Sequence, residues 1–127
     1  MAGRVERFED LVAWQRAREL AREIYKMCRG DKIRRDFALI NQLTRSAGSV
    51  MANIAEGFDR HGSKEFHRFL TIAGGSCAEV RSLLYVALDA GYLLEQDFDR
   101  LRSLAEEASR IIGGLRTAVS RSIEHNA

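Results

Sequence analysis

Apolar residues recur every three or four positions along four long stretches of the chain, and short polar or glycine-containing breaks separate these stretches. This spacing is typical of one face of an α-helix, because 3.6 residues complete a turn. It predicts four helices, over residues 8–29, 36–57, 63–90 and 95–121. The chain contains no proline, which favours long helices joined by short glycine or polar loops.

The second stretch shows the most regular apolar pattern. Its apolar positions step by three or four residues: Ile40, Leu43, Ala47, Val50, Ile54 and Phe58. Such a near-heptad spacing is the packing pattern of helical bundles. Short connections force neighbouring helices to run antiparallel. We therefore expect residues 1–127 to form one all-α domain, an antiparallel up-down-up-down four-helix bundle.

Three residues are predicted to mark helix ends. Asp36 and Ser63 are suitable N-caps for the second and third helices, because a side-chain oxygen there accepts a hydrogen bond from a free backbone N–H. Gly91 is a natural stop for the third helix.

Two glycine pairs lie inside predicted helices. Gly74-Gly75 falls in the third helix and Gly113-Gly114 in the fourth. Each glycine weakens a helix by about 0.5–1 kcal/mol relative to alanine. The pairs therefore suggest close approach of another backbone or a slight kink, and tolerated weak spots are the alternative.

A stripe of mostly uncharged polar residues runs along the second helix. Its members step by one to four positions: Gln42, Arg45, Ser46, Ser49, Asn53 and Glu56. They cover about a third of the helix circumference, roughly 130° from the apolar face. Amide and hydroxyl groups suit an interface in which each finds a hydrogen-bond partner. That interface could be with another helix of the chain, a second subunit or a ligand, and a solvent face is the alternative.

Basic residues gather near the start of the chain. Residues 1–35 hold ten basic and six acidic side chains, whereas the whole chain has a net charge of +2. One helix face carries Arg18, Arg22, Lys26 and Arg29, and the following loop carries Lys32, Arg34 and Arg35. A cationic stripe of this kind can follow a phosphate backbone. Glu19 and Glu23 lie three or four positions away and would partly neutralise it, so a solvated amphipathic face is the alternative.

No pattern predicts a catalytic residue, a metal site or a cofactor. His61 and His67 have no cysteine or acidic pair at a spacing that would complete a tetrahedral metal site. Cys28 and Cys77 fall at apolar helical positions and are expected to be free, buried thiols in the reducing cytoplasm. No apolar run approaches 18 residues and no export signal begins the chain, so no contact with a membrane is expected.

Three segments resemble a bacterial four-helix bundle family: FEDLVAWQRARELAREIY, QLTRSAGSVMANIAEGF and KEFHRFLTIAGGSCAEVRSLL. Members of that family include proteins encoded in intervening sequences of large-subunit ribosomal RNA genes. The accessory variability proteins of diversity-generating retroelements look like relatives. Where many members have a proline before the string ANIAEG, this chain has Met51, so no proline kink is expected there.

The resemblance implies a bundle that assembles as a ring, typically a homopentamer, and a role in binding nucleic acid or a nucleic-acid enzyme. It also implies that the polar stripe and Gly57 match the signature positions of the family. The basic residues and the resemblance together lead us to expect a non-enzymatic, cytoplasmic homo-oligomer that binds RNA or DNA. The alternative is an interaction scaffold that docks a protein partner such as a polymerase.

Overall fold

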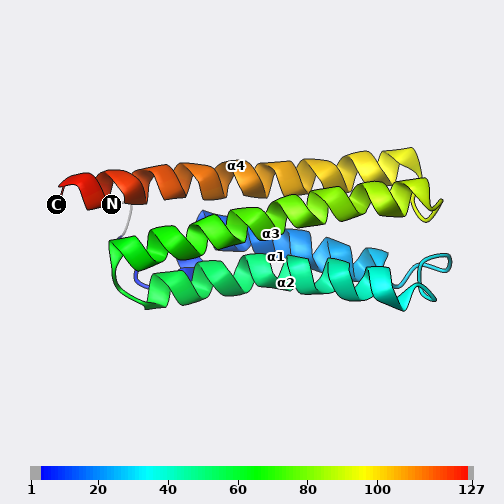
Figure 1. The fold of residues 1–127 in the computed structure, drawn as a ribbon, viewed down its shortest axis with the longest axis horizontal. Helices are drawn as coiled ribbons and strands as arrows, with labels where there is room; N and C mark the ends of the chain where they lie inside the picture. The colour runs from blue at the N-terminus through cyan, green and yellow to red at the C-terminus, as the bar shows by residue number, and fades with distance from the viewer. Residues whose placement is uncertain (1–3, 126–127) are drawn as a thin grey trace.

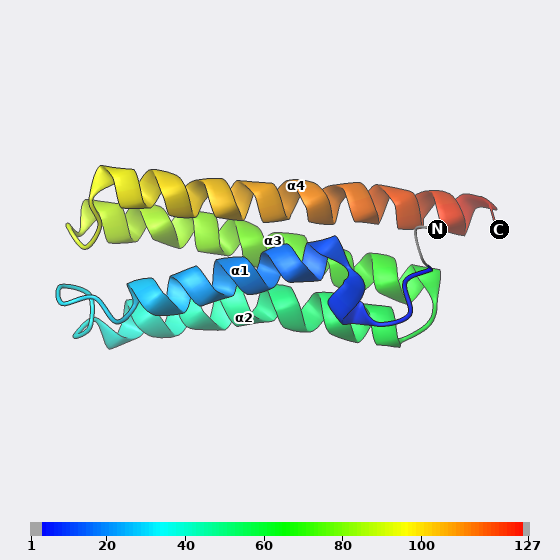
Figure 2. The same cartoon turned by 180° about the vertical axis from the view of Figure 1, so that it is seen from behind.

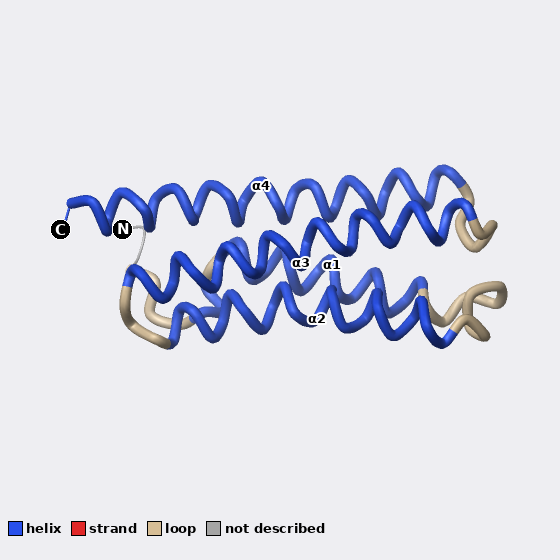
Figure 3. Tube along the Cα trace, viewed as in Figure 1, coloured by secondary structure: helices blue, strands red, loops and turns tan. Residues whose placement is uncertain are grey.

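The computed structural model describes residues 4–125, which form a short 3-10 helix and four α-helices. These elements are η1 (Phe8–Asp10), α1 (Val12–Met27), α2 (Phe37–Asp59), α3 (Ser63–Asp89) and α4 (Glu95–His125). The four helices run alternately in opposite directions, side by side (Figures 1 and 2). Loops lie only at the two ends of the bundle (Figure 3). The predicted antiparallel four-helix bundle is therefore confirmed.

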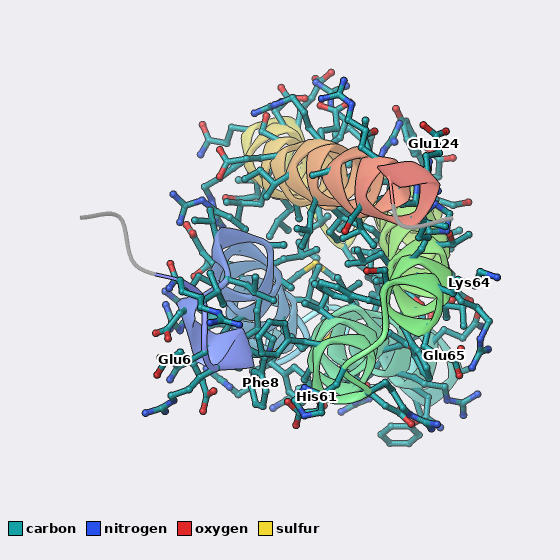
Figure 4. All side chains as sticks on the ribbon, turned by 90° about the vertical axis from the view of Figure 1, so that its left-hand side faces the viewer. Glu6, Phe8, His61, Lys64, Glu65 and Glu124 are labelled. Atoms are coloured by element: carbon teal, nitrogen blue, oxygen red, sulfur yellow. The ribbon has the colours of Figure 1, made fainter. Side chains whose placement is uncertain are left out.

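Each helix buries one apolar face in a shared core. Leu43, Val50 and Ile54 of α2 are 0% exposed, as the apolar spacing predicts. α1 lies next to α2 and α4, and α3 lies next to the same two helices, whereas in the described residues the backbones of the diagonal pairs stay further apart. A view along the bundle shows mainly carbon atoms between the helices and charged groups around the rim (Figure 4).

The first helix begins four residues later than predicted. Residues Phe8–Asp10 form the separate helix η1, and the extended backbone of Leu11 separates it from α1. The Phe8 and Trp14 rings meet edge to face, with centroids 5.3 Å apart. The Gln15 side chain donates a 2.9 Å hydrogen bond to the carbonyl of Glu9. These contacts fold η1 back onto α1, which the apolar period alone does not predict.

The predicted helix ends are confirmed at Asp36 and Gly91 but not at Ser63. Asp36 caps α2 by accepting a 3.1 Å hydrogen bond from the Leu39 N–H. Gly91 follows α3 with φ +81°, and the N–H of Tyr92 bonds back to the Ala87 carbonyl. Ser63 is already the first residue of α3, and the capping position before it belongs to Gly62. α4 extends to His125, four residues past its predicted end.

The glycine pairs do not mark close approach within the chain. A Cβ added to Gly74 or Gly113 would meet nothing within 4 Å, and the same holds for their neighbours Gly75 and Gly114. Close approach occurs instead at Gly57, where an added Cβ would lie 2.5 Å from the Cβ of Phe69. Gly57 therefore lets α2 and α3 come together.

Candidate nucleic-acid interface

The outer face of α1 carries the first part of the predicted basic surface. α1 lies between α2 and α4 and is in front in Figure 2. Arg18, Arg22, Lys26 and Arg29 are all exposed. Arg18, Arg22 and Lys26 lie within an arc of about 80°, over about 12 Å of α1, and Arg29 lies in the turn after α1 ends at Met27. The geometry therefore aligns three cations on one exposed stripe of α1, and the fourth, Arg29, follows in the adjoining turn.

The glutamates expected to neutralise this stripe pair with other arginines. Glu19 lies 3.7 Å from Arg16, and Glu23 lies 2.6 Å from Arg100 of α4. Arg16 also reaches Glu107 of α4 at 2.7 Å. Within residues 4–125, none of the seven predicted phosphate-binding side chains forms a salt bridge. Their positive charge is therefore directed to solvent.

A hollow lies at the start of the stripe. It has a volume of about 390 Å³, and its lining includes Trp14, Arg18 and Arg22. The Arg18 guanidinium lies 5.8 Å from the centre of the Trp14 ring, which is a cation–π distance. Glu9 and Glu19 also line the hollow and weaken its positive field. Trp14 is half-buried, packing against the core while it also lines this hollow.

The loop between α1 and α2 carries the rest of the basic surface. Lys32, Arg34 and Arg35 are exposed, whereas Ile33 between them is 2% exposed and anchors the loop in the core. The Arg34 N–H bonds to the Gly30 carbonyl at 3.1 Å. The loop is therefore ordered by its own contacts, although it lies at one end of the bundle (Figure 1).

Asp36 links this loop to the connection between α3 and α4. Its Oδ2 accepts a 2.9 Å hydrogen bond from the Tyr92 hydroxyl, while its Oδ1 caps α2. The bond to the Asp36 carboxylate raises the pKa of Tyr92, because the phenol must stay protonated to donate. The two loops at this end are thus held together by one carboxylate.

The structure divides the polar stripe of α2 into two sets. The Ser49 hydroxyl lies 2.9 Å from the hydroxyl of Ser76 on α3, and the Asn53 amide donates to Ser49 Oγ at 2.9 Å. Ser46 is 3% exposed and donates to the Gln42 carbonyl. These three residues therefore find partners within the chain. The side chains of the other three are exposed: Gln42, Arg45 and Glu56.

Ser76, the partner of Ser49, could not be identified from the sequence. A lone serine in an apolar helix carries no signal of its role until the facing helix is known. Glu56 is also engaged locally, because its carboxylate accepts a 3.1 Å hydrogen bond from Arg60. The assignment of the whole stripe to a contact between subunits stays a prediction.

The two cysteines are buried thiols. Burial raises the pKa of Cys28 and of Cys77 to about 11. The Cys77 thiol donates a 3.1 Å hydrogen bond to the Ala105 carbonyl. Such thiols are poor nucleophiles at neutral pH, because the reactive form is the thiolate.

No group of three or more histidine, cysteine or acidic residues gathers as a metal site in the described part of the chain. His61 lies at the end of the bundle between α2 and α3, with φ 58° (Figure 4). No helix among residues 4–125 is both long and apolar enough to cross a membrane.

Comparisons with known proteins give one family and one similar fold. The family model described as 23S rRNA-intervening sequence protein matches residues 9–114. A protein of unknown function from the S23 ribosomal protein family of Bacteroides thetaiotaomicron VPI-5482 has a crystal structure similar to this one. The TM-score is 0.75 at 21% identity, over 83% of this chain and 98% of that chain. The likeness shows that the two proteins share a fold. No curated protein gave a significant match.

Proposed function

This chain belongs to the family of 23S rRNA-intervening sequence proteins, and from that premise we propose that it binds structured nucleic acid without catalysing a reaction. We favour RNA over DNA as the ligand because the family description refers to ribosomal RNA. We place the protein in the cytoplasm, where buried cysteines persist as free thiols.

The observation that carries this proposal is the row of unpaired cations on α1 and the following loop. Arg18 and Arg22 stay exposed while the nearby Glu19 and Glu23 are held by Arg16 and Arg100. A charged side chain that forms no salt bridge within the chain is free to replace the counterions of a phosphate. Several such groups in one line match the repeating charge of a nucleic-acid backbone.

Assembly would strengthen this surface. The net charge of one chain is only +2, so five copies in a ring would carry about +10. We propose the homopentamer that the family resemblance implies. The exposed apolar side chains of Ile72 and Val86 on α3 support assembly, since they are 41% and 49% exposed. Light scattering coupled to gel filtration measures the mass of the assembly in solution. The mass of a single chain would refute the proposed homopentamer.

A salt titration tests the binding. Fluorescence anisotropy of a labelled RNA hairpin should show an affinity that falls log-linearly with salt, with a slope of about −0.9 per phosphate contacted in a duplex. The double variant Arg18→Glu and Arg22→Glu should abolish binding and keep the mass of the assembly. Arg116→Glu with Arg121→Glu is the matched control, because it removes the same charge from exposed positions on α4. If both double variants lost the same RNA affinity, binding would depend on net charge, and a binding surface localised on α1 would be refuted.

A protein-interaction scaffold is the second candidate. The same exposed apolar residues of α3, Ile72 and Val86, favour it, because the centre of a protein interface is apolar. On this view the chain docks a nucleic-acid enzyme such as a polymerase. A pull-down from the native host after nuclease treatment should then return that enzyme. Recovery of nucleic acid alone in an untreated pull-down would count against this candidate.

A further inference from the structure

Phe37 is the most exposed large hydrophobic residue in the described part of the chain. Its side chain is 75% exposed, compared with 51% for Tyr25 and 64% for Leu94. It is the first residue of α2, directly after the basic loop. Single exposed apolar residues are common on protein surfaces, so it is the position of this ring beside positive charge, together with its exposure, that points to a contact with something outside the chain.

Three exposed cations precede Phe37 within five residues: Lys32, Arg34 and Arg35. The carboxylates of Asp31 and Asp36 lie in the same segment, so residues 31–36 carry three positive and two negative charges, a net charge of +1. The Asp36 carboxylate is held at the start of α2, where it caps the helix and binds Tyr92. The same two hydrogen bonds hold the backbone around Phe37 in place. The ring is therefore presented from a fixed position beside positive charge.

We propose that Phe37 stacks against an unpaired base while Lys32, Arg34 and Arg35 bind the phosphates beside it. This inference rests on the proposed function and specifies its ligand as nucleic acid with single-stranded nucleotides. Every base offers an aromatic face, and stacking on exposed aromatic side chains is the usual device for holding single strands. Bases within a duplex already stack on each other, so a blunt duplex has no unpaired base on which Phe37 can stack.

A second copy of the chain is a poorer occupant for this ring. In a two-fold contact through Phe37, the cations at Lys32, Arg34 and Arg35 would face their own copies, and in the head-to-tail contact of a ring the same three cations would enter the interface together with the phenyl ring. Like charges brought together across an interface are unfavourable, and charged residues are depleted at interface centres. A nucleic acid provides bases that stack on the ring and phosphates that pair with the cations.

The experiment compares two RNA probes with one hairpin stem, one ending blunt and one carrying a 3′ tail of unpaired nucleotides. Phe37→Ala should weaken binding of the tailed probe by about 5- to 100-fold, the range expected for one stacked base. The affinity for the blunt probe and the salt slope should stay unchanged, because no phosphate contact is lost. Phe37→Trp should retain the wild-type affinity for the tailed probe, because an indole ring can also stack on a base. Leu94→Ala, which trims another exposed apolar side chain at this end of the bundle, should behave as wild type.

A fluorescent base in the tail gives a second reading. 2-Aminopurine changes its emission when it stacks, so its signal should respond to wild type and not to Phe37→Ala. Equal affinity of wild-type protein for both probes, with no effect of Phe37→Ala, would overturn this inference and leave the proposed function standing. Absence of binding to either probe at low salt would overturn both. A change in the mass of Phe37→Ala by light scattering would show that the ring packs against a second copy, which also overturns it.

Discussion

Replacing Gly57 by alanine tests whether α2 and α3 depend on close contact at this one position. The added Cβ would lie 2.5 Å from the Cβ of Phe69 and 3.2 Å from the ring of Phe66. Ordinary contacts between such carbons begin near 3.5 Å, so the helices must separate by about 1 Å. The Cβ of Phe69 is fixed to the backbone of α3 and cannot turn away.

The magnitude follows from two opposing effects. Overpacking of this kind costs about 1–3 kcal/mol. Alanine in place of glycine stabilises a helix by at most about 0.5–1 kcal/mol. We therefore expect Gly57→Ala to lower the free energy of unfolding by up to about 2.5 kcal/mol. Because Phe69 is 6% exposed, little room exists for relaxation.

Gly48→Ala is the matched control in the same helix. A Cβ at Gly48 would meet nothing within 4 Å, so only the gain in helix propensity applies. This variant should raise the free energy of unfolding by about 0.5–1 kcal/mol. The difference between the two variants then isolates the steric cost at Gly57.

Urea unfolding followed by circular dichroism measures both variants, and equal m-values would show that the unfolded states are comparable. Gel filtration at the same protein concentration checks that neither change alters assembly. If the two variants have the same stability within about 0.5 kcal/mol, the distance at Gly57 does not limit the packing of α2 and α3, and the reasoning fails.

The remaining predictions concern caps, a turn and the thiols. Asp36→Ala should lower the free energy of unfolding by about 0.5–2 kcal/mol by removing the cap of α2, and Tyr92→Phe should have a smaller effect in the same urea assay. Gly91→Ala should destabilise by about 1–2 kcal/mol through its left-handed backbone, with Gly91→Asn intermediate. Cys28 and Cys77 should react slowly with a thiol reagent at pH 8 and rapidly in urea. Folding raises both thiol pKa values to about 11, so burial of the protonated thiols makes stability depend on pH. The stability linked to the protonated thiols is fully present below the unfolded pKa of about 8.5 and is lost as pH rises towards 11. Urea unfolding at pH 7 and pH 10.5 should therefore show a larger loss of stability in wild type than in a double cysteine-to-alanine variant.

The helices and most of the core could be predicted because the same spacing of apolar residues, three or four positions apart, indicates both the helix and its buried face. Val50 and Ile54 are fully buried as their spacing requires, and Asp36 caps α2 as its side chain suggests. The start of α1 could not be predicted in this way. The break at Leu11 is favoured by the contact between Phe8 and Trp14 and by a side-chain bond across it, and neither appears as a period.

The sequence could predict which residues make up the basic surface but not which of their charges are neutralised by ion pairs. Helical spacing places Arg18 and Arg22 on one face, but the same spacing also allows Glu19 and Glu23 to neutralise them. Local spacing favours such pairs within a helix. The structure brings Arg100 of α4 to Glu23, so α4 removes part of the neutralising charge. Which cations stay free is therefore decided by the neighbouring helix.

The sequence by itself determined that this chain forms four amphipathic helices with a basic end, because the apolar period and the charge distribution are local properties. Only the tertiary structure decided what each repeated residue type does. Gly57 and Gly74 are the same residue in similar helices, yet one meets α3 and the other meets open space. The hydrogen bond of Ser49 and the exposure of Phe37 were decided in the same way, since each depends on which helix lies opposite. That information lies in the packing of the helices rather than in the spacing of residues along any one of them.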